Sequence, residues 1–303
     1  MANSLYTYKN TISVMNAPNR ETRKLWDGIT EIASSPDYDG MALSVRQVYY
    51  QCVVRGKVPT NSSREYRRVQ RAVLQMRRHG ELPWGKIRDG TRERNHFQLY
   101  ESPEDAIAHA ARYYRQDVMA RQFVHVELWV EKEGLLGFLQ MVANDFGLPY
   151  AALKGQPSDS FQQEAGEDWC QIGKPVVVIY AGDFDSSGYF IGETLQDRLL
   201  QHYAAVTVEH IGLNADLVKK YDMPPAFEAK KADKRTPEFI RRFGKQCYEL
   251  DAIKPDELRR LYRDKVMEFV NMQDLNASRR EEALHRETLD ALVRGGLPVR
   301  PRK

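Results

Sequence analysis

The sequence predicts an α/β protein in which a basic, helical N-terminal part precedes a parallel sheet. After residue 123, strand-like and helix-like segments alternate, which is typical of a parallel sheet covered by helices. Residues 175–181, PVVVIYA, form a continuous apolar run, as expected of a strand covered on both faces. The charge is also uneven: residues 41–94 hold 13 Lys or Arg against 4 Asp or Glu, in a chain of net charge +3. A basic module joined to a more acidic α/β domain is therefore expected.

Composition argues against several classes of protein. The first residues, MANSLYTYKN, contain no apolar core of a secretory signal, and no apolar run approaches the ~18 residues of a membrane span. The three cysteines are odd in number and far apart, which favours reduced thiols over a disulfide framework or a zinc site. No G-x-x-x-x-G-K-[ST] phosphate-binding loop is present. We expect a cytoplasmic protein without a membrane partner.

The basic part reads as two helices joined by a turn. Residues 42–54, ALSVRQVYYQCVV, predict an amphipathic helix that ends at the turn-rich stretch RGKVPTNSS. Ser62 and Glu65 fit a capping box that opens a second helix from about Ser63 to Arg78. With the HGELPW segment that follows, this is the layout of a winged-helix or helix-turn-helix DNA-binding module. The alternative is a solvated charged surface. The candidate DNA-binding residues lie largely off the apolar stripe of the second helix: Arg64, Arg67, Arg68, Arg71 and Arg78.

The rest of the chain predicts the sheet and its helices. Residues 102–122 predict a connecting helix, residues 249–270 a short strand and a helix, and residues 277–293 a charged helix followed by a basic tail. Further helices are expected over residues 134–147 and 187–203. The predicted strands cover residues 123–130, 149–155, 175–181 and 205–213.

Three acidic residues directly follow two of the predicted strands. Glu131 follows one strand in WVEKEG, and Asp183 and Asp185 follow another in IYAGDFDSSG. Because parallel strands end at one edge of the sheet, we expect these carboxylates to lie close together. Clustered carboxylates repel one another unless a cation neutralises them, and an all-oxygen cluster suits Mg²⁺ or Mn²⁺. Glu133 is a further candidate ligand or base. The alternative is a turn with capping aspartates and an unrelated glutamate.

These motifs together resemble the Toprim domain of the topoisomerase VI A subunit and its meiotic double-strand-break relative. The matching segments are WVEKEG, KGQPS after a short strand, and GDFDSSG. That family places a winged-helix domain with the signature R-D-[IV]-[FY]-Y before the Toprim domain, and residues 46–50 here read R-Q-V-Y-Y. The resemblance covers roughly residues 41–265. Two positions depart from the family's motifs: Gln47 replaces the usual aspartate, and KGQPS replaces K-G-Y-P-D. The chain is also short for a topoisomerase A subunit. It looks closer to small stand-alone A-like proteins of bacterial mobile elements and to the nuclease subunit of the Wadjet plasmid-defence system.

The resemblance implies an organisation and a reaction. The regions are an N-terminal extension (1–40), a winged-helix domain (41–100), a connecting helix (101–122), a Toprim domain (123–270) and a C-terminal helix with a basic tail (271–303). Tyr50 matches the tyrosine that attacks a DNA phosphate, and Arg46 matches the arginine that assists it. The implied metal ligands, for Mg²⁺ or Mn²⁺, are Glu131, Asp183 and Asp185. The implied assembly is a homodimer, with a separate ATPase subunit as a further partner. In it, the tyrosine of one protomer meets the metal of the other and each protomer cuts one strand of double-stranded DNA, leaving 5′-phosphotyrosine links.

Tyr49 and Tyr50 are adjacent on the predicted helix and point about 100° apart, so we expect Tyr49 to be buried and Tyr50 exposed. Arg46 lies one turn before Tyr50, where its guanidinium favours the phenolate or holds the phosphate. Two other functions stay open. One is a metal-dependent hydrolytic nuclease that uses the acidic site without Tyr50, and the other is a non-catalytic DNA-binding protein.

Overall fold

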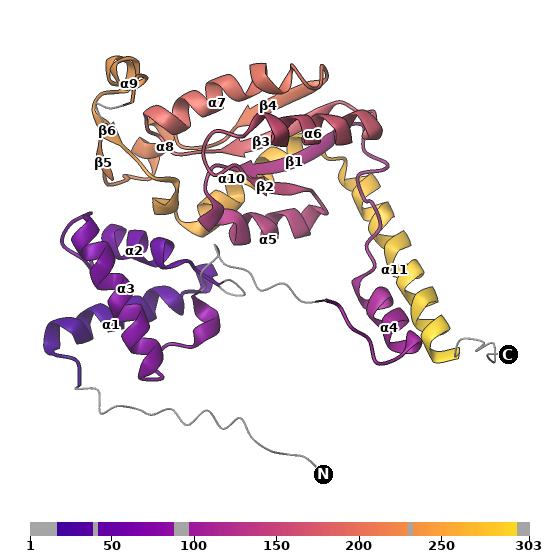
Figure 1. The fold of residues 1–303 in the computed structure, drawn as a ribbon, viewed down its shortest axis with the longest axis horizontal. Coiled ribbons are helices and arrows are strands. Elements are labelled where there is room, and N and C mark those ends of the chain that lie inside the picture. The colour runs from indigo at the N-terminus through magenta and orange to yellow at the C-terminus, as the bar shows by residue number, and fades with distance from the viewer. Residues whose placement is uncertain (1–16, 39–41, 88–96, 230–232, 296–303) are drawn as a thin grey trace, which may run out of the picture.

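The computed structural model describes residues 17–38, 42–87, 97–229 and 233–295 (Figure 1). The N-terminal stretch 1–16 and the predicted basic tail beyond residue 295 lie outside these residues, as do residues 88–96 of the predicted winged-helix domain. The described residues contain a four-stranded parallel sheet, which confirms the predicted α/β class. Its strands, in the spatial order β2-β1-β3-β4, are β1 (His125–Val130), β2 (Tyr150–Ala152), β3 (Val176–Ala181) and β4 (Val206–His210).

Helices cover both faces of this sheet. Val126, Leu128 and Val130 of β1 join a buried cluster with α5 (Leu136–Phe146) and α10 (Pro255–Phe269). On the opposite face, Trp129 joins a second cluster with α6 (Asp159–Ile172) and α7 (Ser186–Leu199). Every residue of β3 is buried, which accounts for its continuous apolar sequence.

The N-terminal part is a bundle of three helices, α1 (Arg20–Ala33), α2 (Val45–Val54) and α3 (Ser63–Arg78), with a parallel bridge between Leu43 and Ile87. The 3-10 turns η1 (Pro36–Tyr38) and η2 (Trp84–Lys86) accompany them. α1 was not predicted from the sequence, yet it packs against both other helices through residues such as Trp26 and Ile29. The helical part therefore begins well before residue 41.

Side-chain caps fix where the two predicted helices begin. α3 has the predicted bounds, and the Ser62 hydroxyl accepts a hydrogen bond from the Glu65 N–H. α2 begins at Val45 because Ser44 and Gln47 form a reciprocal capping box. Gln47 thus has a structural role in starting the helix.

Several segments differ from the prediction. The connecting helix is shorter, α4 (Pro103–Tyr113), because the chain becomes extended at Tyr114 and then buries Val118 and Met119 in the core. The expected short strand after residue 249 is instead the 3-10 turn η4 (Leu250–Ala252). Besides α1, three helices were not predicted from the sequence: α6, α8 (Ala215–Lys220) and α9 (Thr236–Phe243). A small antiparallel pair, β5 (Phe227–Glu228) with β6 (Gln246–Cys247), was also not predicted.

The C-terminal helix α11 (Met272–Gly295) confirms the predicted charged helix and extends it at both ends. Figure 1 shows α4 and α11 side by side, extending away from the sheet. A short turn, η3 (Glu133–Leu135), follows β1. Of the helices in the described ranges, none has the length and apolar composition needed to span a bilayer.

Candidate functional site

The structure brings the predicted acidic residues to one edge of the sheet. Val130 pairs with Ala181 at the ends of β1 and β3, so Glu131 and Asp183 leave the sheet beside each other. The Glu131 carboxylate accepts a hydrogen bond of 2.9 Å from the Asp183 backbone N–H. Asp185 caps α7, where one carboxylate oxygen accepts from the Ser187 and Gly188 N–H groups at 2.8 Å each. The juxtaposition expected from the strand-end positions is therefore present for Glu131 and Asp183.

A lysine, not an empty cation position, faces these acids. The Lys132 ammonium lies 2.8 Å from Asp183 and 3.1 Å from Asp251, and it also pairs with Glu249. The other oxygen of Asp183 accepts from the Leu250 N–H at 2.7 Å. Within the described ranges, no group of three or more His, Cys, Asp or Glu side chains is arranged to hold a metal ion. In this arrangement the predicted Mg²⁺ or Mn²⁺ ligands do not fit a metal, because both oxygens of Asp183 are engaged.

Three charged residues of this cluster were not predicted from the sequence. Glu249 and Asp251 are buried acids that flank the start of η4, and Lys132 follows Glu131 directly. The available signal was the E-x-D pattern of ELD just after Cys247 and Tyr248, which parallels the D-x-D after β3. Glu133, the extra candidate, lies apart from the cluster's ion pairs and instead pairs with Lys154 at 2.8 Å.

The helix α2 brings Tyr50 and Arg46 to the same cluster within one chain. Arg46 lies 3.0 Å from Glu249 and 3.7 Å from Asp251. The Tyr50 hydroxyl accepts a hydrogen bond of 3.5 Å from the same Arg46 guanidinium nitrogen that pairs with Glu249. The Lys132 ammonium lies 5.9 Å from the centre of the Tyr50 ring. A tyrosine hydroxyl, a carboxylate acceptor and two cations thus meet where the helical part contacts the sheet edge.

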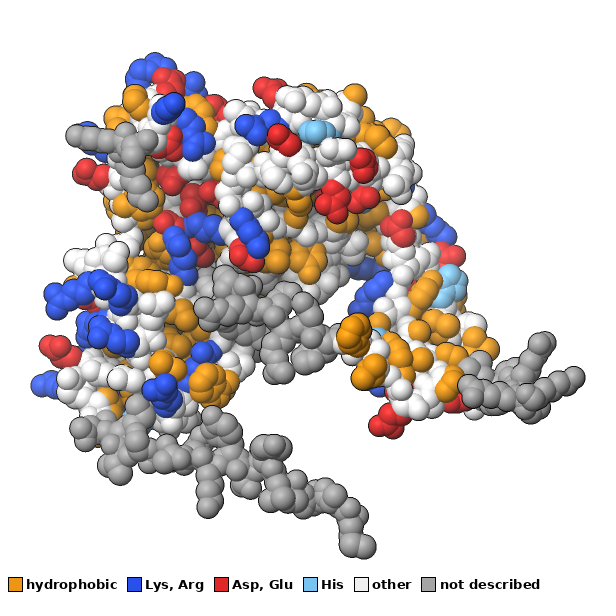
Figure 2. Space-filling view, in the orientation of Figure 1, with side chains coloured by type: hydrophobic (Ala, Val, Ile, Leu, Met, Phe, Trp, Pro, Cys, Tyr) orange, Lys and Arg blue, Asp and Glu red, His pale blue; other side chains and the backbone are white. Residues whose placement is uncertain are grey.

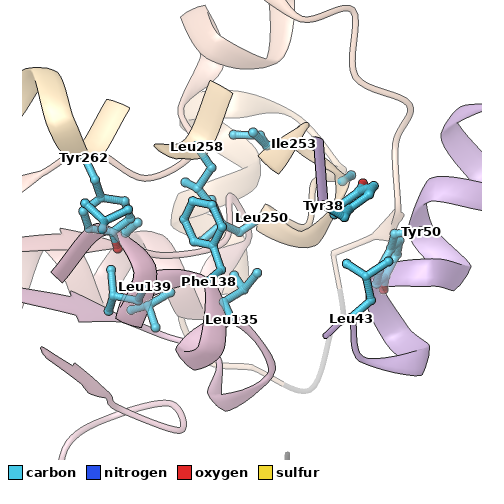
Figure 3. Close-up of a cluster of buried hydrophobic side chains, with 14 of the residues drawn as sticks. Tyr38, Leu43, Tyr50, Leu135, Phe138, Leu139, Leu250, Ile253, Leu258 and Tyr262 are labelled. Atoms are coloured by element: carbon cyan, nitrogen blue, oxygen red, sulfur yellow. The ribbon is translucent and has the colours of Figure 1, made fainter. Parts of the chain in front are cut away.

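The expectation that Tyr50 is exposed is wrong, because Tyr49 is 3 % and Tyr50 is 7 % exposed. The two side chains leave α2 in different directions, but their ring centres lie 5.3 Å apart and both residues are covered. Tyr49 faces α3 and Tyr66, whereas Tyr50 faces the sheet domain. Figure 3 shows Tyr50 on the helical side of the shared cluster, with Leu250 and Leu135 across from it.

Burial and charge set the protonation states in the cluster. Burial raises the pKa of the Tyr50 hydroxyl, the charge of Glu249 raises it further, and Arg46 and Lys132 oppose the shift. Burial also acts to raise the pKa of Glu249, but Lys132 and Arg46 outweigh it and the pKa is lowered. Burial works against the charged form of Lys132, yet the surrounding carboxylates raise its pKa well above the usual value. The resting state is therefore a neutral Tyr50 beside an ionised Glu249 and a charged Lys132.

The pKa values of Glu131 and Asp183 are raised, in contrast to that of Glu249. Burial, followed by the charges of neighbouring acids, raises the pKa of Glu131, although its hydrogen bond from Asp183 N–H acts the other way. Burial also raises the pKa of Asp183 well above its usual value, against the opposing effect of Lys132. Glu131 and Asp183 therefore hold a proton more readily than free carboxyl groups do.

The predicted arginines line an exposed face of α3. Arg64, Arg67 and Arg71 border an open groove of about 580 Å³ together with Gln70 and Leu74. Arg78 is exposed as well, whereas Arg68 is half-buried and pairs with Glu65 at 3.2 Å. Figure 2 shows basic side chains gathered over the helical part of the molecule.

Compared with models of known protein families and with curated proteins, the chain shows no match. The functional argument therefore rests on the geometry of the cluster around Tyr50 and on the basic face of α3.

Proposed function

We propose that this protein cleaves double-stranded DNA by transesterification at Tyr50, in the manner of the topoisomerase VI A subunit. The position of the Tyr50 hydroxyl carries this proposal, because Arg46 bonds both to it and to Glu249 and the Lys132 ammonium lies 5.9 Å from the Tyr50 ring centre. A phenol with a pKa of about 10 is a poor nucleophile at neutral pH, so it needs a proton acceptor and nearby positive charge. As part of the same proposal, α1–α3 form a winged-helix domain and the sheet domain is of the Toprim class.

The reaction assigns each side chain one task. The Tyr50 oxygen attacks phosphorus, its proton passes to Glu249, and the bond from phosphorus to the 3′-oxygen breaks. The 3′-oxygen takes up a proton from water, which gives a 5′-phosphotyrosine and a 3′-hydroxyl. Arg46, whose side chain is 52 % exposed, and Lys132 stabilise the negative charge on the phosphate oxygens. The family resemblance implies that Glu131, Asp183 and Asp185 bind Mg²⁺ or Mn²⁺. The steps described above do not require that metal.

The proposal extends to partners. Each chain carries one Tyr50, so cutting both strands takes two chains, and we propose a homodimer acting on DNA in the cytoplasm. A separate ATPase subunit would be required for strand passage. Sedimentation of the full chain with and without DNA tests the dimer.

Denaturing electrophoresis of the protein incubated with labelled DNA and Mg²⁺ or Mn²⁺ tests the function, with any ATPase subunit added. The parent should form a covalent protein–DNA adduct, and Tyr50→Phe should form none while keeping its affinity for DNA. Tyr49→Phe is the matched control: its hydroxyl bonds to Asn61 and Ser62, so its loss weakens packing without removing the nucleophile. Robust cleavage by Tyr50→Phe would instead establish a hydrolytic nuclease. Binding without cleavage by the parent would establish a DNA-binding protein.

A further inference from the structure

A pocket of about 330 Å³ opens beside Tyr50, between α2, the start of α3 and β5. Its lining combines four aromatic side chains with polar ones and a guanidinium. We call it the tyrosine pocket, and the residues that matter for its chemistry are Tyr49, Tyr50, Tyr66, Phe227, Arg46 and Ser63.

The walls of the tyrosine pocket are held by hydrogen bonds. The Tyr49 hydroxyl donates to the Asn61 side chain and accepts from the Ser62 N–H, each at 2.7 Å. Asn61 in turn donates to the Ala226 carbonyl at 2.8 Å, which ties the helical part to β5. The Tyr49 ring centre lies 5.3 Å from the ring centres of both Tyr50 and Tyr66. The pocket is therefore formed before any ligand arrives, which lowers the entropic cost of binding.

The lining selects a flat ring attached to an anion. Aromatic side chains bind nucleobases by stacking, whichever base is presented. Arg46 adds a guanidinium at the end of the pocket that adjoins Tyr50, and guanidinium groups match phosphate geometry. The volume is at the low end for small-molecule sites, so the pocket accepts one nucleotide but not a base pair with its neighbours.

We propose that the tyrosine pocket holds one unstacked nucleobase, from the nucleotide adjoining the phosphate that meets Tyr50. This rests on the proposed function, because the phosphate position is defined by Tyr50. Drawing a base out of the duplex costs least where it is mismatched or unpaired. The protein should therefore prefer DNA that carries one unpaired base over fully paired DNA of the same length.

The test measures binding by the full chain carrying Tyr50→Phe, so that cleavage cannot interfere. Fluorescence anisotropy compares a paired duplex with the same duplex containing a single-base bulge. The bulged duplex should bind about tenfold tighter, the equivalent of one base–aromatic stack. Adding Tyr66→Ala should abolish the preference while affinity for the paired duplex stays within about twofold, and Tyr66→Phe should restore it because the ring is kept. Tyr113→Ala, at an exposed tyrosine on α4, should leave the preference intact.

The possible outcomes distinguish a failure of base binding in the tyrosine pocket from a failure of the proposed DNA cleavage. The proposal that the pocket holds a base would be overturned if the chain carrying only Tyr50→Phe showed no preference for the bulged duplex. It would also be overturned if the preference survived the addition of Tyr66→Ala. Photocrosslinking with 5-iodouracil placed at successive positions should label Tyr66 or Phe227 from the nucleotide at the cleavage point, and labelling from every position would also overturn it. If the preference is present but no adduct ever forms with Tyr50 intact, the pocket stands and the proposed function fails.

Discussion

Lys132 occupies the place at the sheet edge where the strand-end acids predict a divalent ion. Its ammonium pairs with Asp183, Glu249 and Asp251, and it is largely buried. A fixed ammonium and a metal ion satisfy the same carboxylates, so the two compete. We therefore expect Lys132 to oppose binding of a metal at this edge.

Replacing Lys132 by Met should destabilise the protein by about 3 kcal/mol or more, because three buried carboxylates lose their shared cation. Mn²⁺ should restore part of that stability in the variant and raise the melting temperature of the parent much less. Thermal unfolding with and without Mn²⁺, together with electron paramagnetic resonance of bound Mn²⁺, measures both effects.

Two variants serve as controls for that experiment. Lys132→Arg keeps a cation and should behave like the parent. Lys154→Met removes an exposed pair with Glu133 and should cost less than about 1 kcal/mol. Equal Mn²⁺ binding by the parent and Lys132→Met would show that lysine and metal do not compete.

Glu249→Gln should lower the rate of adduct formation by about 10²-fold or more while DNA affinity is unchanged, because the amide accepts no proton from Tyr50. Glu249→Asp should retain more activity, since it keeps a carboxylate.

Glu249 also gives a pH prediction. Burial acts to raise its pKa, but Lys132 and Arg46 produce a net lowering below the usual 4.5. A lowered carboxyl pKa stabilises the folded state above pH 4.5, and this contribution is lost as pH falls below that value. The difference in unfolding free energy between the parent and Glu249→Gln should therefore be constant at neutral pH and change only below about pH 4.5. A difference that varies between pH 6 and 8 would contradict the assignment.

The basic helix α3 has one buried apolar face and one exposed basic face. Val69 and Met76 are fully buried in the helical core, whereas Arg64, Arg67 and Arg71 line the open groove. Arg68 is engaged by Glu65, so it contributes less to a DNA surface than its sequence position indicates.

Replacing Arg64, Arg67 and Arg71 together by Gln should weaken binding to any DNA sequence and lower the slope of log affinity against log salt by about 2.7. A matched triple variant at the exposed Arg112, Arg280 and Arg294 of α4 and α11 should leave the slope unchanged. Binding titrations from 50 to 200 mM salt measure this, and equal slopes for both variants would identify α3 as an ordinary solvated face.

The helical part and the sheet domain share one buried cluster. Tyr38, Leu43 and Tyr50 meet Leu250 and Ile253 in its centre (Figure 3), and Arg46 adds an ion pair to Glu249 across the same contact. The groups of the cluster around Tyr50 come from both sides, so their geometry depends on this contact.

Because the core is continuous, calorimetry should show one unfolding transition for the whole chain. Leu250→Ala should destabilise that single transition by about 2–5 kcal/mol, since a fully buried leucine leaves a cavity. Leu284→Ala, at an exposed position of α11, should change it by less than about 0.5 kcal/mol. Two separate transitions, with Leu250→Ala affecting one of them, would show that the parts fold independently.

The parallel sheet, the bounds of α3 and the meeting of Glu131 with Asp183 could all be predicted from the sequence. Each depends on local patterns: apolar runs, a serine cap, and acids directly after strands whose ends share an edge. The capping box at Ser44 and the apolar spacing of α1 are also local patterns, so they too could have been predicted from the sequence. The burial of Tyr50 and the cluster of Lys132 with Glu249 could not be predicted, because they depend on the contact of α2 with η4. Arg46 and Glu249 lie 203 positions apart in the chain, and no local pattern specifies which distant acid faces a helix.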